Sequence, residues 1–221
     1  MREPYKPLTR KRRKAVHEIK VHDIEQRSDE WYEIRRGCLS ASMANRIITA
    51  EGKRSNSIQD VINEMVAQRI TGEINEIPVT EAMQHGIDTE DEAVKFFEFA
   101  NDVTVQKIGF VTIDKPDVRI GCSPDGIIKE TKHLLEVKCP QPKKQIKVLR
   151  DAKLPTEYKA QTQMQLYVCN AEKLEFISYH PKSIALMVSV ERDDVFLHCL
   201  KNLLDEANEK INELTEQLRR K

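Results

Sequence analysis

The chain has 221 residues, of which 39% are hydrophobic and 33% charged, with only 7 glycines and 9 prolines. This composition is typical of a globular protein and argues against a disordered, collagen-like or disulfide-rich chain. No apolar run approaches the ~20 residues of a membrane span, and no hydrophobic segment follows the basic N-terminus, so a secreted or membrane protein is disfavoured. The 5 cysteines include no CxxC pair, which favours reduced cytoplasmic thiols over a zinc or iron–sulfur site.

Charge is segregated along the chain although the net charge is zero. Residues 138–159 contain seven Lys or Arg and two acids, whereas residues 73–102 contain nine acids and one Lys. A neutral total can therefore hide a basic surface beside an acidic site. Residues 1–21 are expected to form a basic N-terminal extension that contacts phosphates, serves as a localisation signal or is simply solvated. Residues 22–221 are expected to form a single domain with a long C-terminal helix.

The predicted elements run from helices through strands to a closing helix. In the first part of the chain, we expect helices from residue 28 to a break at Gly37, from about 40 to 48, over 57–70 and after Gly86. Strands are expected next, over 103–113, 118–122 and 134–139. A helix over 156–170, strands over 174–179 and 185–190, and an amphipathic helix over 195–218 are expected to follow. This order predicts an α/β fold in which a central mixed β-sheet is flanked by helices. The last helix is expected to pack on its own domain or on a neighbouring subunit.

Two carboxylates and a lysine form the most informative pattern in the sequence. Asp125 lies in a proline-glycine turn, and Glu136 and Lys138 follow within a strand. Because side chains alternate along a strand, Glu136 and Lys138 share one face while Val137 points the other way. Two carboxylates and a main-chain carbonyl suit Mg²⁺ or Mn²⁺, and a lysine can orient a water and offset developing phosphate charge. The pattern predicts metal-assisted phosphodiester hydrolysis, although an exposed strand can carry the same residues without a function.

Two further groups of polar residues are candidates for the same site. Glu90 shares the apolar stripe of its helix, which makes it a third carboxylate candidate, or an acid favoured by the helix macrodipole. Tyr158, Gln161 and Gln165 share one face of another helix, with Gln163 on a different face. This face could contact a water or phosphate, or could be exposed. Cys122 and Cys139 are interpreted as small buried residues beside strands.

Five ordered motifs resemble the phage lambda-exonuclease-like (YqaJ-type) viral recombinases, a branch of the PD-(D/E)xK nuclease superfamily. They are SDEWYEIRRGCLSAS at 28–42, GIDTEDEA at 86–93 with FFEF at 96–99, CSPDG at 122–126, LEVKCP at 135–140 and YKAQTQ at 158–163. The resemblance implies a restriction-endonuclease-like core and a ring-shaped homotrimer. It implies digestion of one strand of linear double-stranded DNA from its 5′ end, leaving a 3′ single strand for an annealing partner. A phage- or prophage-encoded protein in the cytoplasm of a bacterial host would fit this activity.

The resemblance also assigns residues to roles. Asp125, Glu136, the main-chain carbonyl of Val137 and Glu90 would hold Mg²⁺, with two ions per site and Mn²⁺ as a substitute. Lys138 would be the catalytic lysine, Glu90 would be a catalytic acid on the helix beside the metals, and Gln161 would contact the active-site water. For the DNA end, the implied residues are Arg35 and Ser42 in the 5′-phosphate pocket and Met83 as an apolar wedge. His85 departs from the family pattern, which has a bulky aromatic before the glycine.

Two other functions remain open at this point. The same fold could serve a structure-specific or restriction-like endonuclease, although such an enzyme would not need Arg35 and Ser42 to hold a DNA end. Alternatively, the protein could be a non-catalytic module that binds DNA ends or loads a partner. The presence of Asp125, Glu136 and Lys138 argues against a silent module.

Overall fold

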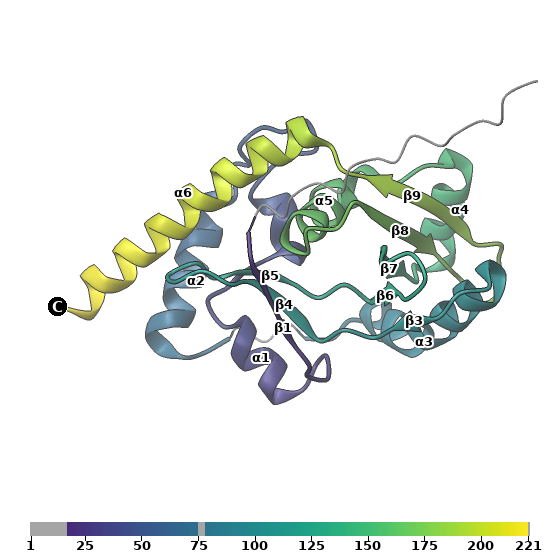
Figure 1. The fold of residues 1–221 in the computed structure, drawn as a ribbon, viewed down its shortest axis with the longest axis horizontal. Helices are drawn as coiled ribbons and strands as arrows, with labels where there is room; N and C mark the ends of the chain where they lie inside the picture. Colours follow the sequence, from purple (N-terminus) through teal and green to yellow (C-terminus); the bar gives the residue numbers. More distant parts are fainter. Residues whose placement is uncertain (1–16, 75–77, 221) are drawn as a thin grey trace, which may run out of the picture.

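The computed structural model describes residues 17–74 and 78–220, so most of the predicted N-terminal extension lies outside the described residues. Two mixed β-sheets form the centre of the molecule (Figure 1). The first has the order β1-β4-β5-β2, from strands Ile19–His22, Phe110–Ile113, Ile120–Cys122 and Leu39–Ser40. Its edge strand β1 therefore includes residues 19–21, which the sequence analysis placed in the extension.

The second sheet carries the residues of the candidate site. Its order is β3-β6-β7-β8-β9, from strands Val105–Gln106, Gly126–Ile128, Leu134–Lys138, Lys173–Ser178 and Leu186–Glu191. Strand β7 pairs antiparallel with β6 and parallel with β8, so it is the central strand of this sheet and is hydrogen-bonded to a neighbouring strand on each side. Parallel and antiparallel pairs also mix in the first sheet, where β2 runs parallel to β5. The predicted mixed α/β architecture is confirmed, with its strands divided between two sheets.

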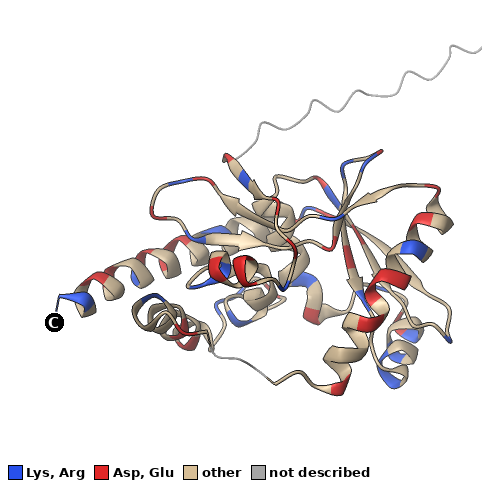
Figure 2. Ribbon diagram, turned by 90° about the horizontal axis from the view of Figure 1, so that it is seen from below, with Lys and Arg blue, Asp and Glu red and all other residues tan. Residues whose placement is uncertain are grey.

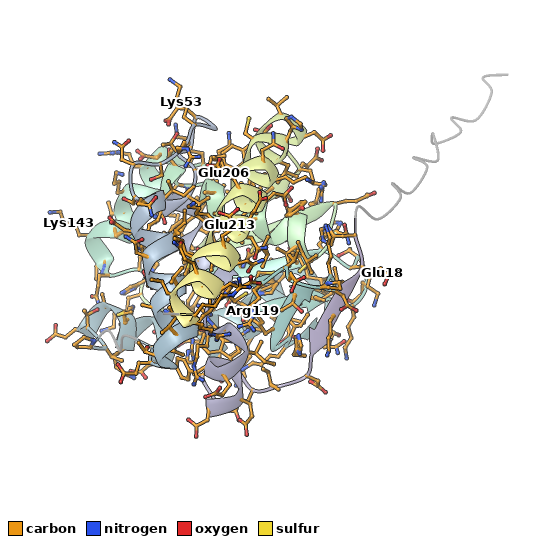
Figure 3. The ribbon with its side chains drawn as sticks, turned by 90° about the vertical axis from the view of Figure 1, so that its left-hand side faces the viewer. Glu18, Lys53, Arg119, Lys143, Glu206 and Glu213 are labelled. Atoms are coloured by element: carbon orange, nitrogen blue, oxygen red, sulfur yellow. The ribbon has the colours of Figure 1, made fainter. Side chains whose placement is uncertain are left out.

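Helices cover these sheets and bury their apolar faces. Around the first sheet, the largest core cluster joins α2 (Ile58–Thr71), α5 (Lys159–Val168) and α6 (Asp194–Arg219). A second cluster packs α3 (Glu81–Asn101) against β7 and β8. Figure 3 looks onto α6, whose acidic outer face includes Glu206 and Glu213, both exposed. The predicted amphipathic helix thus packs on its own chain.

The structure corrects several predicted elements in the first half of the chain. The helix expected from about 40 to 48 is instead strand β2 followed by the 3-10 helix η1 (Ala41–Arg46). Helix α3 begins at Glu81 rather than after Gly86, because the Thr80 side chain accepts a hydrogen bond from the Met83 N–H and caps the helix earlier. The strand expected over 103–113 is divided into β3 and β4, because the chain crosses there from one sheet to the other.

Two further elements, β6 and α4 (Pro142–Asp151), were not predicted from sequence. Strand β6 is only three residues long and begins at Gly126, the last residue of the predicted turn. Helix α4 is a short, lysine-rich helix whose buried residues are Gln145 and Val148. Helix α1 (Asp29–Arg35) follows its predicted Ser28 cap, and Trp31 is buried as expected of a core residue.

The charge pattern of the sequence reappears on the surface. Figure 2 shows acidic residues along α3 and basic residues on α4. No helix among the described residues combines the length and the apolar character needed to cross a membrane.

Candidate active site

Asp125 lies in the short connection between β5 and β6, where the backbone is held close to β7. Its Oδ2 accepts a hydrogen bond of 2.6 Å from the backbone N–H of Val137, and its own N–H donates to the Leu135 carbonyl at 3.0 Å. The next residue must be glycine, because a Cβ on Gly126 would lie 2.3 Å from a side-chain carbon of Val105. The turn therefore places the Asp125 carboxylate beside the middle of β7, as the sequence predicted.

Glu136 is the most deeply buried acid of the site, with 1% of its surface exposed. Its Oε1 accepts hydrogen bonds from Lys138 and from Gln161, the latter at 2.5 Å, and its Oε2 accepts one from Gln165 at 2.6 Å. These contacts confirm that Glu136 and Lys138 share a face of β7 and that Gln161 and Gln165 share a face of α5. Three donors on one buried carboxylate compensate for the water it has lost.

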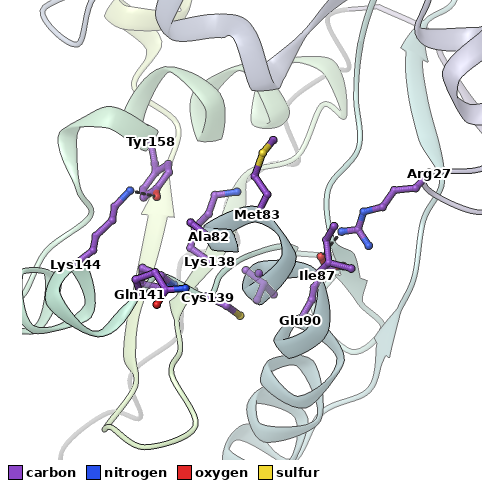
Figure 4. Close-up of a pocket in the computed structure, with 13 residues that line it drawn as sticks. Arg27, Ala82, Met83, Ile87, Glu90, Lys138, Cys139, Gln141, Lys144 and Tyr158 are labelled. Carbon is purple, nitrogen blue, oxygen red and sulfur yellow. Dashed lines mark hydrogen bonds and ion pairs between the residues drawn. The ribbon is translucent and has the colours of Figure 1, made fainter. Parts of the chain in front are cut away.

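A cavity of 560 Å³ opens above this end of β7 (Figure 4). Its wall combines side chains from β7, α3, α4 and η2 (Thr156–Tyr158), and Met83 lines it with about half of its surface exposed. The charged groups in the wall are Arg27, Glu90, Lys138 and Lys144. The cavity is therefore accessible to a substrate and mostly cationic.

Glu90 faces the cavity from α3 and forms an ion pair of 2.6 Å with Arg27 (Figure 4). Arg27 was missed in the sequence analysis, because it lies 63 residues from Glu90 in the chain and belongs to no motif. Burial and the negative charge of Glu136 raise the pKa of Asp125 well above its ordinary value, and Glu90 adds to this effect while Lys138 opposes it. The acids of the site are thus close enough to repel one another.

The donor set fits a hard divalent cation, although no three His, Cys, Asp or Glu side chains within residues 17–74 and 78–220 are arranged to hold a metal ion. Glu136 Oε2 accepts one hydrogen bond, and the bond from Val137 uses one carboxylate oxygen of Asp125. Both carboxylates therefore retain lone pairs, and a cation between them would offset the repulsion that raises the pKa of Asp125. Two carboxylates with a nearby main-chain carbonyl suit an ion such as Mg²⁺ that keeps several waters.

Arg35 and Ser42 form a separate polar pair connected to the Asp125 loop. Arg35 Nη2 donates to Ser42 Oγ at 3.2 Å, and its guanidinium carbon lies 3.9 Å from the centre of the Trp31 ring. Trp31 in turn donates from its indole nitrogen to Ser123 Oγ at 2.8 Å, two residues before Asp125. This chain of contacts fixes the guanidinium relative to the acidic site. Burial lowers the pKa of Arg35, as expected for a cation partly removed from water.

The structure thus brings most of the candidate residues to one place. Asp125, Glu136, Val137 and Lys138 meet at β7. Val137 and Lys138 line the cavity together with Glu90 and Met83 from α3, whereas Asp125 and Glu136 are not among its lining residues. Arg35 and Ser42 contact each other, but neither lines this cavity. Cys122 and Cys139 are buried, as interpreted from the sequence.

Comparisons with known proteins agree with these features. Residues 30–172 match the family described as YqaJ-like viral recombinase domain. Among solved structures, an alkaline exonuclease (LHK-Exo) from Laribacter hongkongensis is 27% identical with a TM-score of 0.77, and its complex with dAMP gives 27% and 0.75. Each of these matches covers 87% of this chain and 97% of the other chain.

A phage-related exonuclease from Haemophilus somnus 129PT shares the fold at 13% identity, with a TM-score of 0.60 over 82% of this chain and 96% of the other. No curated protein matches the sequence. The family match spans more than half of the chain and includes the α1 motif, Asp125, Glu136 and Lys138. The structural matches confirm the restriction-endonuclease-like fold and make the protein a homologue of nucleases. This chain therefore belongs to the YqaJ-like viral recombinase family.

Proposed function

We propose that the protein is a metal-dependent exonuclease that digests one strand of linear double-stranded DNA from its 5′ end. The observation that carries this proposal is that Asp125 and Glu136 lie beside Val137 and Lys138, which line an accessible cavity at the end of β7. The similar alkaline exonuclease structure that holds dAMP supports a mononucleotide product. We further propose that a homotrimeric ring leaves a 3′ single strand for an annealing protein, as in the family that the motifs resemble.

In this proposal, Asp125, Glu136, the Val137 carbonyl and Glu90 would hold Mg²⁺. When bound, the metal would supply Lewis acidity toward a phosphodiester oxygen and a water of lowered pKa. Glu136 is positioned for this role by Gln161 and Gln165, whose side-chain amides orient its two oxygens. Glu90 would leave its ion pair with Arg27, which lies in the cavity wall and could then contact the substrate.

Lys138 would act on the reacting phosphate. Its ammonium group contacts Glu136, and the charges of Glu136 and Asp125 raise its pKa despite the opposing effect of burial, so that it stays protonated. A protonated lysine can orient a water and stabilise negative charge that develops on the phosphate oxygens. Arg35 and Ser42 would hold the 5′-terminal phosphate, because a guanidinium fork and a short hydroxyl match its oxygens. Met83, half-exposed in the cavity wall, would separate the strands at the duplex end.

Degradation of defined DNA substrates tests the proposal. A linear duplex with 5′-phosphates, a 5′-hydroxyl duplex and a closed circle are each incubated with Mg²⁺ or with EDTA. We expect the phosphorylated linear duplex to be degraded to mononucleotides from its 5′ ends when Mg²⁺ is present, and the circle to stay intact. The variant Lys138→Ala should be inactive, whereas Lys173→Ala on the neighbouring strand should be active.

Other outcomes would replace the proposed function. Cleavage of the circle would indicate an endonuclease and remove the proposed roles of Arg35 and Ser42. Binding of DNA ends without hydrolysis would indicate a non-catalytic end-binding module.

A further inference from the structure

Helix α4 presents a row of cations on its exposed face. Lys143, Lys147 and Arg150 are spaced by four and three residues, which places them on one side of the helix. Arg150 contacts Asp151 at 2.9 Å, but Lys143 and Lys147 form no ion pair with any other described residue. Figure 3 shows Lys143 projecting from the edge of the molecule. Neither charge is therefore neutralised by a direct ion pair, although Lys147 acts at longer range on Glu157, whose pKa is lowered chiefly by its hydrogen bond with Lys144.

The helix is fixed rigidly to the sheet that carries the candidate site. Gln145 is fully buried and donates to the carbonyls of Ser178 at 3.2 Å and Ile184 at 2.9 Å. It also accepts a hydrogen bond of 2.7 Å from the Ser178 hydroxyl. Ser178 pairs in register with Lys138, so these bonds define where α4 lies relative to the end of β7. Such an anchor would keep the cations of α4 in constant register with the cavity.

Lysine side chains connect this exposed face to the cavity. Lys144 lines the cavity wall, where its ammonium donates to the Tyr158 hydroxyl at 2.8 Å (Figure 4). The same ammonium also pairs with Glu157 at 2.5 Å. Its Nζ lies 5.1 Å from the centre of the Tyr158 ring, and Nζ of Lys138 lies 5.4 Å from the same point. A continuous series of cations thus leads from Lys138 through Lys144 to the surface of α4.

This arrangement of lysines is unfavourable for the helix by itself. Lys143 and Lys144 lie in the first turn, which has no acidic residue and is the positive end of the helix macrodipole. Lys143 and Lys147 are also like charges four residues apart, a spacing that destabilises a helix. A polyanion bound along this face would remove both conflicts. A positively charged surface of this kind suits a phosphate backbone, which is recognised by charge without regard to base sequence.

We propose that the exposed face of α4, with Lys143 and Lys147 as its principal cations, binds the phosphate backbone of the DNA strand that leads into the cavity. This inference rests on the proposed function, because it takes DNA as the substrate of the same site. It predicts that the two lysines affect DNA binding and its salt dependence rather than the chemical step.

The test measures the affinity of the full-length protein for DNA as a function of salt concentration, in EDTA so that binding is separated from hydrolysis. Duplex and single-stranded oligonucleotides of the same sequence are used as separate probes. The test variant is Lys143→Gln with Lys147→Gln, and the control is Lys53→Gln with Lys115→Gln, which changes the net charge equally at exposed positions on other parts of the surface.

Each lost phosphate contact reduces the slope of log affinity against log salt by roughly 0.9 on a duplex and roughly 0.7 on a single strand. For the α4 variant we expect a slope reduced by about 1.8 on the duplex. When the salt concentration rises fourfold, the affinity of the wild type should therefore fall by a factor roughly 10 times larger than that of the variant. The control variant should keep the wild-type slope. The α4 variant should also melt at the same or a higher temperature, because neutralising the lysines relieves their repulsion.

Two results would overturn the inference: an unchanged slope in the α4 variant, or an equal change in the control. A reduced slope on the single strand alone would assign the face to the displaced or digested strand. The proposed function fails separately, if the wild-type protein with Mg²⁺ does not degrade DNA, whatever the salt dependence of binding.

Discussion

Gln165 donates a hydrogen bond of 2.6 Å to Glu136 from inside the core, where both side chains are 1% exposed. Hydrogen bonds to buried charged groups contribute about 1.5–3 kcal/mol, so Gln165→Leu should lower the free energy of unfolding by about that amount. Urea denaturation of the metal-free protein measures the change. Gln59→Leu is the matched control, because Gln59 is exposed on α2 and bonds to another exposed side chain. Equal stability of the two variants would contradict this role for Gln165.

The site residues that could be predicted from sequence are those whose relation is set by local periodicity. Strand alternation predicted that Glu136 and Lys138 share a face, and helical periodicity did the same for Gln161 and Gln165. The contact of Arg27 with Glu90 depends on how distant segments pack, and neither residue type nor spacing indicates it. Helix α4 was not predicted, and its attachment to the sheet through the buried polar residue Gln145 is a long-range contact that no local pattern indicates.

The same distinction explains the errors in element boundaries. The side chain of Thr80 caps α3 six residues before Gly86, since glycine weakens a helix but does not end it when tertiary contacts continue. The segment after Ser40 has helical residues and forms a 3-10 helix packed against α5. Local patterns therefore predicted which side chains share a face, whereas the division into two sheets required knowledge of long-range pairing.

Asp125→Asn separates metal binding from catalysis. The asparagine keeps an oxygen for the Val137 N–H but removes the charge that Glu136 disfavours, so the variant should be at least as stable as wild type in EDTA. Saturating Mg²⁺ at about 100 times its dissociation constant should stabilise wild type by about 2.7 kcal/mol, and the variant much less. Thermal unfolding with and without Mg²⁺ measures both effects. Equal stabilisation of the two proteins would show that Asp125 does not hold the ion.

Tyr179 connects β8 to α3, because its hydroxyl donates to Glu92 at 2.7 Å. This hydrogen bond is the main cause that raises the pKa of Tyr179 to about 12, with burial as a second cause. Since the folded-state pKa lies above the ordinary value of ~10, the stabilising contribution is complete below pH ~10 and is lost as pH rises toward 12. Tyr179→Phe should therefore cost about 1 kcal/mol at pH 8 and less at pH 11. Urea denaturation at the two pH values checks this, and a cost that is the same at both would contradict it.

Arg35 and Ser42 provide a test of how the protein recognises a DNA end. The guanidinium is stacked on Trp31 and contacts the Ser42 hydroxyl, a geometry that can bind two oxygens of a terminal phosphate. Lysine keeps the charge but loses the planar fork and the stacking, so Arg35→Lys should reduce the preference for a 5′-phosphate over a 5′-hydroxyl about 10-fold, or ~1.4 kcal/mol. Initial rates on the two linear duplexes give this ratio.

Arg46→Lys is the control, because Arg46 lies on the neighbouring 3-10 helix and pairs with Glu64. If Arg35→Lys lowers the initial rates on both duplexes equally, Arg35 supports the fold of the site but does not recognise the 5′-phosphate. The proposed digestion from the 5′ end would then lose its structural basis.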